Sequence, residues 1–158
     1  MAPTTDGKTI LLRHTVATLA YRCGKALRGA PAEFASYGGT RTPGDILAHV
    51  CDLFDWALTI ADGKQAWHNS RPQAWEADVA RFFAALEAFD RRLASGAPLA
   101  VEAERLFQGP IADALSHVGQ IAMLRRMAGC KMSGENYFVA KIEAGRVGAD
   151  QAAPVQEF

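Results

Sequence analysis

The sequence predicts an all-α protein, an up-and-down four-helix bundle. Apolar residues recur at spacings of three and four along four long stretches, as on the buried face of a helix. Proline, glycine and small polar residues gather between these stretches, where helices begin and end. No convincing stretch alternates with the period of two that a strand requires. Four amphipathic helices in one small chain bury their apolar stripes against each other, which favours a bundle.

Length and composition indicate one ordinary globular domain. The 158 residues are enough for a single core, so we expect one domain over residues 1–158, with its core at about 8–148 and a tail at 149–158. Lys plus Arg and Asp plus Glu are balanced at 17 each, so no bulk charge attracts nucleic acid or an anionic membrane. No apolar run approaches the roughly 20 residues that cross a bilayer.

The N-terminus and the cysteines favour a cytoplasmic protein. Residues 1–6 lack the charged and then apolar segments of a signal peptide. The cysteines Cys23, Cys51 and Cys130 are odd in number and form no C-x-x-C pair. We therefore expect neither a disulfide scaffold nor a cysteine zinc site, and a reducing compartment fits best.

The first two helices have clear boundaries. The first is predicted to begin after Asp6 and to end near Gly29, followed by a loop over 30–41. The second begins at Thr42, which suits an N-cap, followed by proline at the first helical position and an acid in the first turn. Gly63 is predicted to end it, before a loop over 64–71.

The later elements are predicted with a similar pattern. The third helix is expected from Pro72 to Ser95, with the cleanest apolar line in the chain. A short helical piece is expected within 97–108. The last long helix is predicted to start with Pro110 as its first residue and to stop at Gly129. A brief helix ending near Ala144 and the free tail complete the expected order.

The last long helix carries an acid and a histidine on one face. Asp113 and His117 are four residues apart, so their side chains lie one above the other. On the second helix, His49 falls within the apolar arc. Burying such groups without partners is costly. We interpret the three as ligands of a divalent metal inside the bundle, the alternative being core histidines hydrogen-bonded to the backbone.

The ligand types fit a catalytic metal site. Neutral imidazoles and a carboxylate bind divalent first-row metals, and bundle cores often hold such sites. Three protein ligands leave positions open for water or substrate. This donor set does not distinguish Zn, Ni, Fe and Mn. Gln120, one turn after His117, can support a ligand or a metal-bound water by a hydrogen bond, although a solvent-facing amide is an equally good interpretation.

Two motifs resemble the DinB-like superfamily. The first is Thr-Pro-x-x-Ile-Leu-Ala-His at 42–49, and the second is His-Val-Gly-Gln-Ile-Ala-Met-Leu-Arg-Arg at 117–126. Gly129 and the segment Gly-Glu-Asn-Tyr-Phe at 134–138 fit the same family's ending. The resemblance spans roughly residues 8–148, and the second motif is the most specific part.

The resemblance implies a four-helix bundle, often dimeric, with a metal held by three histidines. His49 and His117 match the first and third of these positions, whereas Asp113 stands at the middle position in place of histidine. Family members with known chemistry resemble small-thiol-dependent transferases and isomerases. The resemblance therefore implies a metal-dependent enzyme that uses a low-molecular-weight thiol and a small-molecule substrate, and a homodimer.

Two other functions remain open on the sequence alone. In the first, the protein is a non-catalytic, stress-linked binding or interaction bundle, in which Asp113 pairs with His117 or His49 and no metal binds. In the second, the site stores or senses a metal without catalysing a reaction. Metal content and thiol-dependent turnover distinguish these functions from the enzyme.

A few other side chains are weaker candidates. His68 is expected in solvent on a loop. Asp52 and Asp55 are expected on the polar side of the second helix, with Asp52 near enough to orient the histidine of that helix. Glu135 or Tyr137 can close over the bundle end as an acid or a substrate contact.

Overall fold

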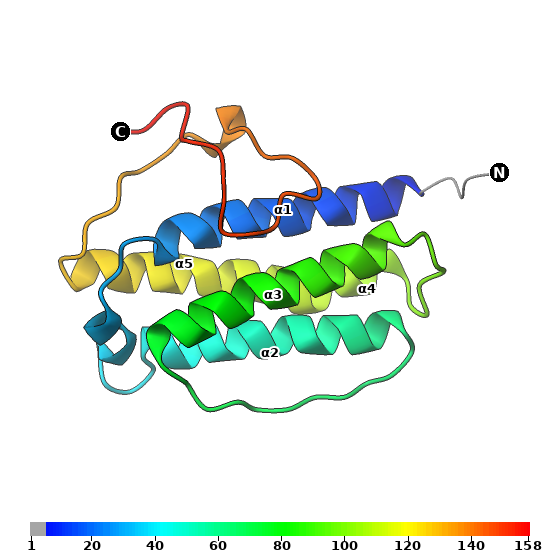
Figure 1. Ribbon diagram of the computed structural model, residues 1–158, viewed down its shortest axis with the longest axis horizontal. Coiled ribbons are helices and arrows are strands. Elements are labelled where there is room, and N and C mark those ends of the chain that lie inside the picture. The colour runs from blue at the N-terminus through cyan, green and yellow to red at the C-terminus, as the bar shows by residue number, and fades with distance from the viewer. Residues whose placement is uncertain (1–5) are drawn as a thin grey trace.

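The computed structural model describes residues 6–158 and confirms an all-α fold of four packed helices (Figure 1). The expectation of a missing signal peptide concerns residues 1–5 and lies outside the described residues. Within 6–158 there is no strand, only an isolated bridge, and no helix is long and apolar enough to cross a membrane. The elements are α1 (Gly7–Leu27), η1 (Ala32–Ser36), α2 (Pro43–Ala61), α3 (Trp75–Ala94), α4 (Ala103–Leu106), η2 (Phe107–Ile111), α5 (Ala112–Met127) and η3 (Tyr137–Val139).

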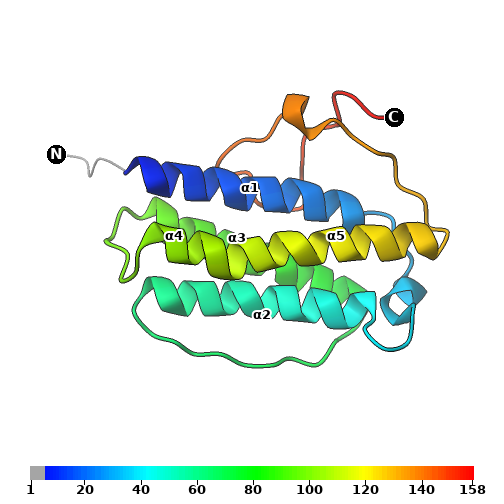
Figure 2. The same cartoon turned by 180° about the vertical axis from the view of Figure 1, so that it is seen from behind.

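Helices α2 and α3 run in the same direction, so the bundle does not alternate strictly up and down. At one end, Arg92 of α3 donates from Nη2 to the carbonyl of Ala61, the last residue of α2, at 3.1 Å. At the other end, Pro72 lies beside Gly44: a Cβ added to Gly44 would be 3.6 Å from the Cβ of Pro72. The chain between α2 and α3 therefore has to return along the whole bundle, and it does so outside α2 (Figures 1 and 2).

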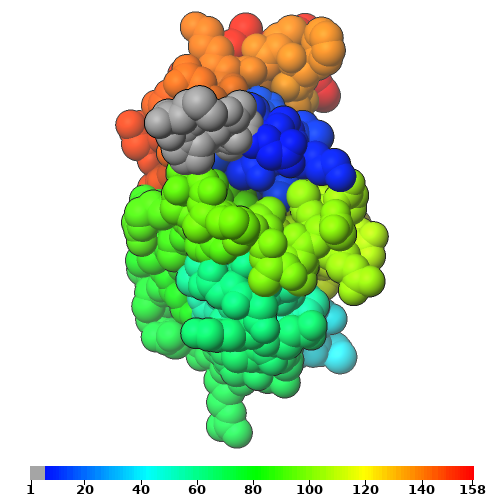
Figure 3. All heavy atoms as spheres, turned by 90° about the vertical axis from the view of Figure 1, so that its right-hand side faces the viewer, coloured from blue at the N-terminus to red at the C-terminus, as the bar shows by residue number. Residues whose placement is uncertain are grey.

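The connection at residues 62–74 is a crossover loop with no helix of its own. Helix α2 has 19 residues and is therefore about 28 Å long. A dozen extended residues reach roughly 40 Å, so the loop is long enough to make this return. Seen from the end of the bundle, part of this loop projects beyond α2 (Figure 3). A loop of this length without helix or strand is uncommon in a compact domain and often has a function.

Local sequence signals explain the ends of α2. Thr42 accepts a hydrogen bond from the Asp45 backbone N–H through Oγ1, and the Asp45 carboxylate accepts one from the Thr42 backbone N–H, at 3.1 and 3.0 Å. This reciprocal pair is a capping box, and Pro43 fills the first helical position, where no N–H is needed. Gly63 follows the helix with φ +75°, a conformation that glycine adopts without strain. Both predicted ends of this helix are confirmed.

The core lies between all four long helices, as the apolar spacing predicts. The phenyl rings of Phe54 on α2 and Phe89 on α3 lie 5.8 Å apart between centroids and are fully buried. Burying one such side chain stabilises the fold by about 1.5–3 kcal/mol. The largest side chains with almost no exposed surface are Phe34, Phe54, Phe82, Phe89, Leu19, Leu47, Leu86, Leu93, Leu106, Ile111, Ile121 and Val16.

The predicted helix start at Pro110 is wrong. The chain is helical without interruption from Ala103 to Met127, and Pro110 lies inside this run. Proline has no N–H to donate and its ring clashes with the preceding turn. The π-helical segment η2, with its wider turn, accommodates it. Proline is common at the first position of a helix, but here the helix continues on both sides of Pro110.

The C-terminal part of the chain also differs from expectation. Instead of a helix to Ala144, the structure has only the single turn η3. The predicted tail is tied back: Gly134 and Phe158 exchange two backbone hydrogen bonds of 3.0 and 3.1 Å. The Glu135 carboxylate accepts from Tyr21 Oη at 2.5 Å and from Lys25 Nζ at 2.9 Å, which fastens this segment to α1. Hydrogen bonds between residues far apart in the sequence hold this segment, which does not form the predicted helix.

We predict that Thr42→Ala lowers the free energy of unfolding by about 1 kcal/mol, because the α2 capping box is lost. Denaturant unfolding followed by circular dichroism measures this change. Thr40→Ala is the matched control, since Thr40 lies in the preceding loop outside the helix. Equal effects of the two substitutions would contradict the role of the box.

Candidate metal centre

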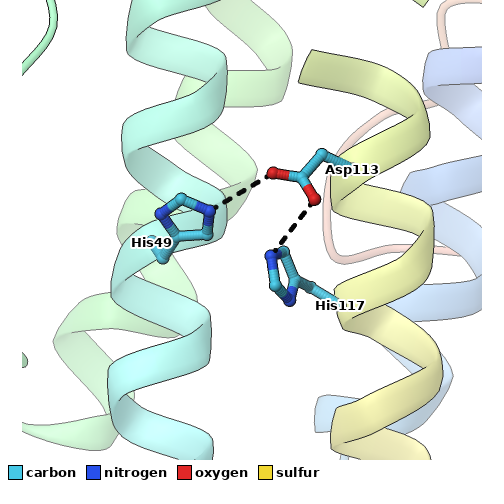
Figure 4. A group of neighbouring side chains, drawn as sticks. All are labelled: His49, Asp113 and His117. Atoms are coloured by element: carbon cyan, nitrogen blue, oxygen red, sulfur yellow. Dashed lines mark hydrogen bonds and ion pairs between the residues drawn. The ribbon is translucent and has the colours of Figure 1, made fainter. Parts of the chain in front are cut away.

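His49, Asp113 and His117 meet between α2 and α5. His49 lies in the middle of α2, and the other two lie one turn apart on the facing side of α5 (Figure 4). The Nε2 atoms of His49 and His117 each lie 3.4 Å from a carboxylate oxygen of Asp113. One ligand atom from each residue lies within 4.8 Å of the other two. The structure therefore brings together the three residues that the sequence predicts as ligands.

The distances suit one small divalent ion. Zinc and similar metals lie about 2.0–2.2 Å from histidine nitrogen and carboxylate oxygen, so two tetrahedral ligands of one ion are about 3.4 Å apart. Each histidine Nε2 lies at this distance from one oxygen of the Asp113 carboxylate, His49 from Oδ2 and His117 from Oδ1. The two imidazole rings stand nearly perpendicular, with centroids 4.8 Å apart, so their Nε2 atoms converge without stacking. The donor set thus fits a metal by residue type and by spacing.

The cluster lies at the edge of the bundle and not inside its core. The side chain of His117 is 10 % exposed, that of His49 27 % and that of Asp113 48 %. The sequence pattern implied that Asp113 is as buried as His117, and this is wrong. Asp113 lies in the first turn of α5, one turn before His117. A metal bound here would be open to small molecules from solvent.

Gln120 supports the orientation of His117. Its Oε1 lies 2.7 Å from His117 Nδ1. With the amide oxygen as acceptor, Nδ1 carries the proton, and Nε2 presents its lone pair toward Asp113. Metal-binding histidines almost always have such a partner on their other nitrogen, which selects the tautomer. The geometry is that expected of a residue supporting a ligand, although Gln120 itself is exposed.

A second group of potential ligands lies nearby, on the other side of α2. It contains Asp52, Asp55 and His68. Here a cation is already present: Arg81 Nη2 lies 2.6 Å from Asp52 and 2.8 Å from Asp55. The guanidinium occupies the place between the carboxylates. In contrast, no lysine or arginine of residues 6–158 pairs with Asp113.

Asp52 stabilises the fold. The sequence had suggested that it orients His49, but its partners lie on other elements. Its side chain is 2 % exposed, whereas the sequence placed it on the polar face. Ser70 donates to it from the backbone N–H and from Oγ, both at 2.7 Å, and His68 Nε2 lies 3.0 Å away. His68 therefore contacts the network of Asp52 and Arg81 and is not a freely solvated loop residue. These contacts fasten the crossover loop to α2 and, through Arg81, to α3.

The pKa of Asp52 reflects these contacts. Burial acts to raise it, but the hydrogen bonds from Arg81 and Ser70 outweigh burial and hold it below its usual value of 3.8. The ionised form therefore stabilises the fold above pH 3.8. This stabilisation is lost as the pH falls through the lower pKa of the folded state.

The anchored loop places Trp67 against the cluster. Its ring centroid lies 5.7 Å from that of His49 and 5.6 Å from that of Trp56. The sequence predicted a loop over 64–71 but did not indicate that Trp67 contacts a ligand. Glu135, considered as an acid near the site, is fully engaged by Tyr21 and Lys25 of α1.

We predict that Asp52→Asn lowers the free energy of unfolding by about 2 kcal/mol at pH 7, because Arg81 loses a charged partner. The difference from the wild type should shrink as the pH falls below about 3.8, where the carboxyl of the unfolded state becomes protonated, and on through the lower pKa of the folded state. Denaturant unfolding at a series of pH values measures both effects. Asp150→Asn is the control, since that side chain is 98 % exposed. A pH-independent difference would contradict the role of the ionised carboxylate.

Comparisons of the chain with protein-family models, with curated proteins and with solved structures find no match. The structure shows an all-helical protein in which four helices pack against one another. Within residues 6–158 it also shows two groups of His and Asp side chains with the spacing of metal ligands. Of these two groups, the one with His49, Asp113 and His117 has a carboxylate without a lysine or arginine of the described residues beside it.

Proposed function

We propose that this protein is a metal-dependent enzyme of the DinB-like type, with His49, Asp113 and His117 as the metal ligands. One observation carries the proposal. Two imidazole nitrogens lie 3.4 Å from one carboxylate that has no lysine or arginine partner among the described residues. A divalent cation compensates this arrangement and satisfies all three donors. The resemblance of the two sequence motifs to the DinB-like superfamily supports the same assignment.

Each residue has a separate role in this proposal. His49 and His117 supply neutral nitrogen ligands from different helices, so that metal binding links α2 to α5. Asp113 replaces a neutral ligand by a charged one and lowers the net charge of the centre by one. A metal ion bound here would lower the pKa of a coordinated thiol and leave coordination positions open. Gln120 holds the proton on His117 Nδ1, which leaves Nε2 available.

The reaction proposed from the family resemblance is transfer or isomerisation assisted by a small thiol. In a transfer, the sulfur of the thiol forms a bond to an electrophilic carbon of the substrate, the bond from that carbon to the leaving group breaks, and the leaving group departs with the bonding electrons and takes up the proton lost by the thiol. The exposure of Asp113, at 48 %, gives small molecules access to the centre. The resemblance also supports a homodimer.

One observation favours the alternative, a non-catalytic bundle without metal. The carboxylate of Asp113 already lies 3.4 Å from both imidazoles, so a protonated histidine can pair with it directly. Its exposure also allows water to solvate it without a metal. In this alternative the protein is a binding or interaction protein, and the three residues only link α2 to α5.

We predict that the protein purified without a histidine tag or chelator binds about one divalent ion per chain. Elemental analysis after addition of Zn, Ni, Fe or Mn measures the content and the preference. Asp113→Ala and His49→Ala should each abolish binding, whereas His14→Ala, on the exposed side of α1, should not. A wild type that takes up none of these ions would refute the enzyme and support the metal-free bundle.

We predict that Gln120→Ala weakens metal affinity by about 10- to 100-fold without abolishing binding, because His117 loses the acceptor that orients it. Competition with a chromophoric chelator measures the affinity. Gln120→Glu, which keeps the acceptor, should retain most of it. An unchanged affinity in Gln120→Ala would show that this hydrogen bond does not support the ligand.

We predict that the metal-loaded protein accelerates the addition of a small thiol to an activated alkene, in which sulfur bonds to one carbon and the proton goes to the other. Loss of free thiol measures the rate, and His117→Ala should reduce it to the uncatalysed level. Metal binding without any turnover across a panel of thiols and electrophiles would instead indicate storage or sensing.

A further inference from the structure

A hollow adjoins the candidate metal centre, between the crossover loop and α5. Its volume is about 410 Å³, within the range of small-molecule pockets, roughly 300–1,000 Å³. Two of its walls are ligand residues of the proposed centre, so a molecule in the hollow would contact the metal. It is lined by His49, Leu53, Trp56, Gln65, Trp67 and Asp113.

Two indole rings form the outer wall of this hollow. The rings of Trp56 and Trp67 meet edge to face, with an angle of 87° between their planes. Trp67 is 42 % exposed, so part of its ring is open to solvent. Its indole N–H is already bonded to Asn69 Oδ1 at 3.2 Å, so the ring is left with apolar contacts.

Trp67 is held in place from both sides. Before it, the backbone N–H of Ala66 donates to Thr59 Oγ1 at 3.3 Å, which fastens the loop to α2. After it, Ser70 donates twice to the buried Asp52. An exposed tryptophan that is anchored on both flanks forms a preorganised wall, and preorganised walls bind ligands with less loss of conformational entropy.

The hollow continues toward the π-helical segment. A second hollow of about 450 Å³ shares Leu53, Trp56 and Asp113 with the first. Its other lining residues are Gln108, Gly109, Ala112 and Ser116. Asp113 is the single charged side chain among the lining residues of the two hollows, and neither contains lysine or arginine. Since Asp113 is a proposed ligand, the remaining walls are uncharged.

We infer that the groove formed by these two hollows binds the uncharged, flat aromatic group of a small molecule. The metal binds an anionic atom of the same molecule, such as a thiolate. Trp67 is then a specificity-determining residue that contacts this group. The inference rests on the proposed metal centre. A ligand with a carboxylate far from the metal finds no cation in the groove, whereas an aromatic ring gains edge-to-face contact with indole.

The test compares benzyl mercaptan with ethanethiol, two thiols that bind a metal through the same atom. Both are titrated calorimetrically, without oxygen, into zinc-loaded protein whose metal content is measured first. Benzyl mercaptan should bind at least about tenfold more tightly to the wild type, because its ring is removed from water in the groove. Trp67→Ala should reduce this ratio to near one, and Trp67→Phe should keep most of it.

Phe138→Ala is the matched control, because Phe138 is an exposed aromatic residue on η3, on the α1 side of the bundle. It should leave the ratio unchanged. Equal affinities for the two thiols in metal-loaded wild type, or an unchanged ratio in Trp67→Ala, would overturn the inference while the metal centre stands. Absence of bound zinc would overturn both, and the metal analysis distinguishes that outcome. Loss of stability in Trp67→Ala with an unchanged ratio would assign Trp67 to loop anchoring alone.

Discussion

The buried carboxylate of Asp52 is the interaction on which the arrangement of this bundle depends. A charge that is 2 % exposed must be compensated, and Asp52 finds its partners on two other elements, Arg81 of α3 and Ser70 of the crossover loop. One group therefore joins α2, α3 and the loop between them. Because α2 and α3 run in parallel, that loop has to return along the bundle, and ordering it costs conformational entropy. The anchor offsets this cost and fixes the loop where it passes the candidate metal centre.

Helix α2 presents two similar clusters to different neighbours, and their electrostatics differ. On one side Asp52 and Asp55 share the guanidinium of Arg81, so that the cluster is already neutralised and stabilises the fold. On the other side His49 faces Asp113, which has no cationic side chain beside it within the described chain. The same residue types can thus form a structural network or a metal site. The position of one arginine decides between them, and residue type alone does not.

The features of this fold that could be predicted from the sequence are those that depend on residues close together in the chain. The ends of α2 follow from Thr42, Pro43 and Gly63, whose roles depend on a few adjacent positions. The meeting of His49 with the last helix was predictable because helical spacing placed His49 and His117 on apolar faces, although the exposure of Asp113 was not. The sequence did not indicate the parallel direction of α3, since a loop of this length permits either direction.

The burial of Asp52 was equally hidden from the sequence. It depends on Arg81, 29 residues further along the chain. In the same way, nothing local indicated that Phe158 pairs with Gly134.

The π-helical turn at Phe107–Ile111 has a consequence for how this chain tolerates change. A π turn contains about one residue more than an α turn, so it accommodates one additional residue while the helices on either side of it keep their faces. Here it allows Leu106 of α4 and Ala114 of α5 to be fully buried within one continuous helix. Leu106 and Ala114 are eight residues apart, and removing one residue from the turn would place them seven apart, about two turns of a regular α-helix, so both could still face the core. The π turn therefore absorbs the additional residue, and a one-residue deletion within it should leave Asp113 facing α2.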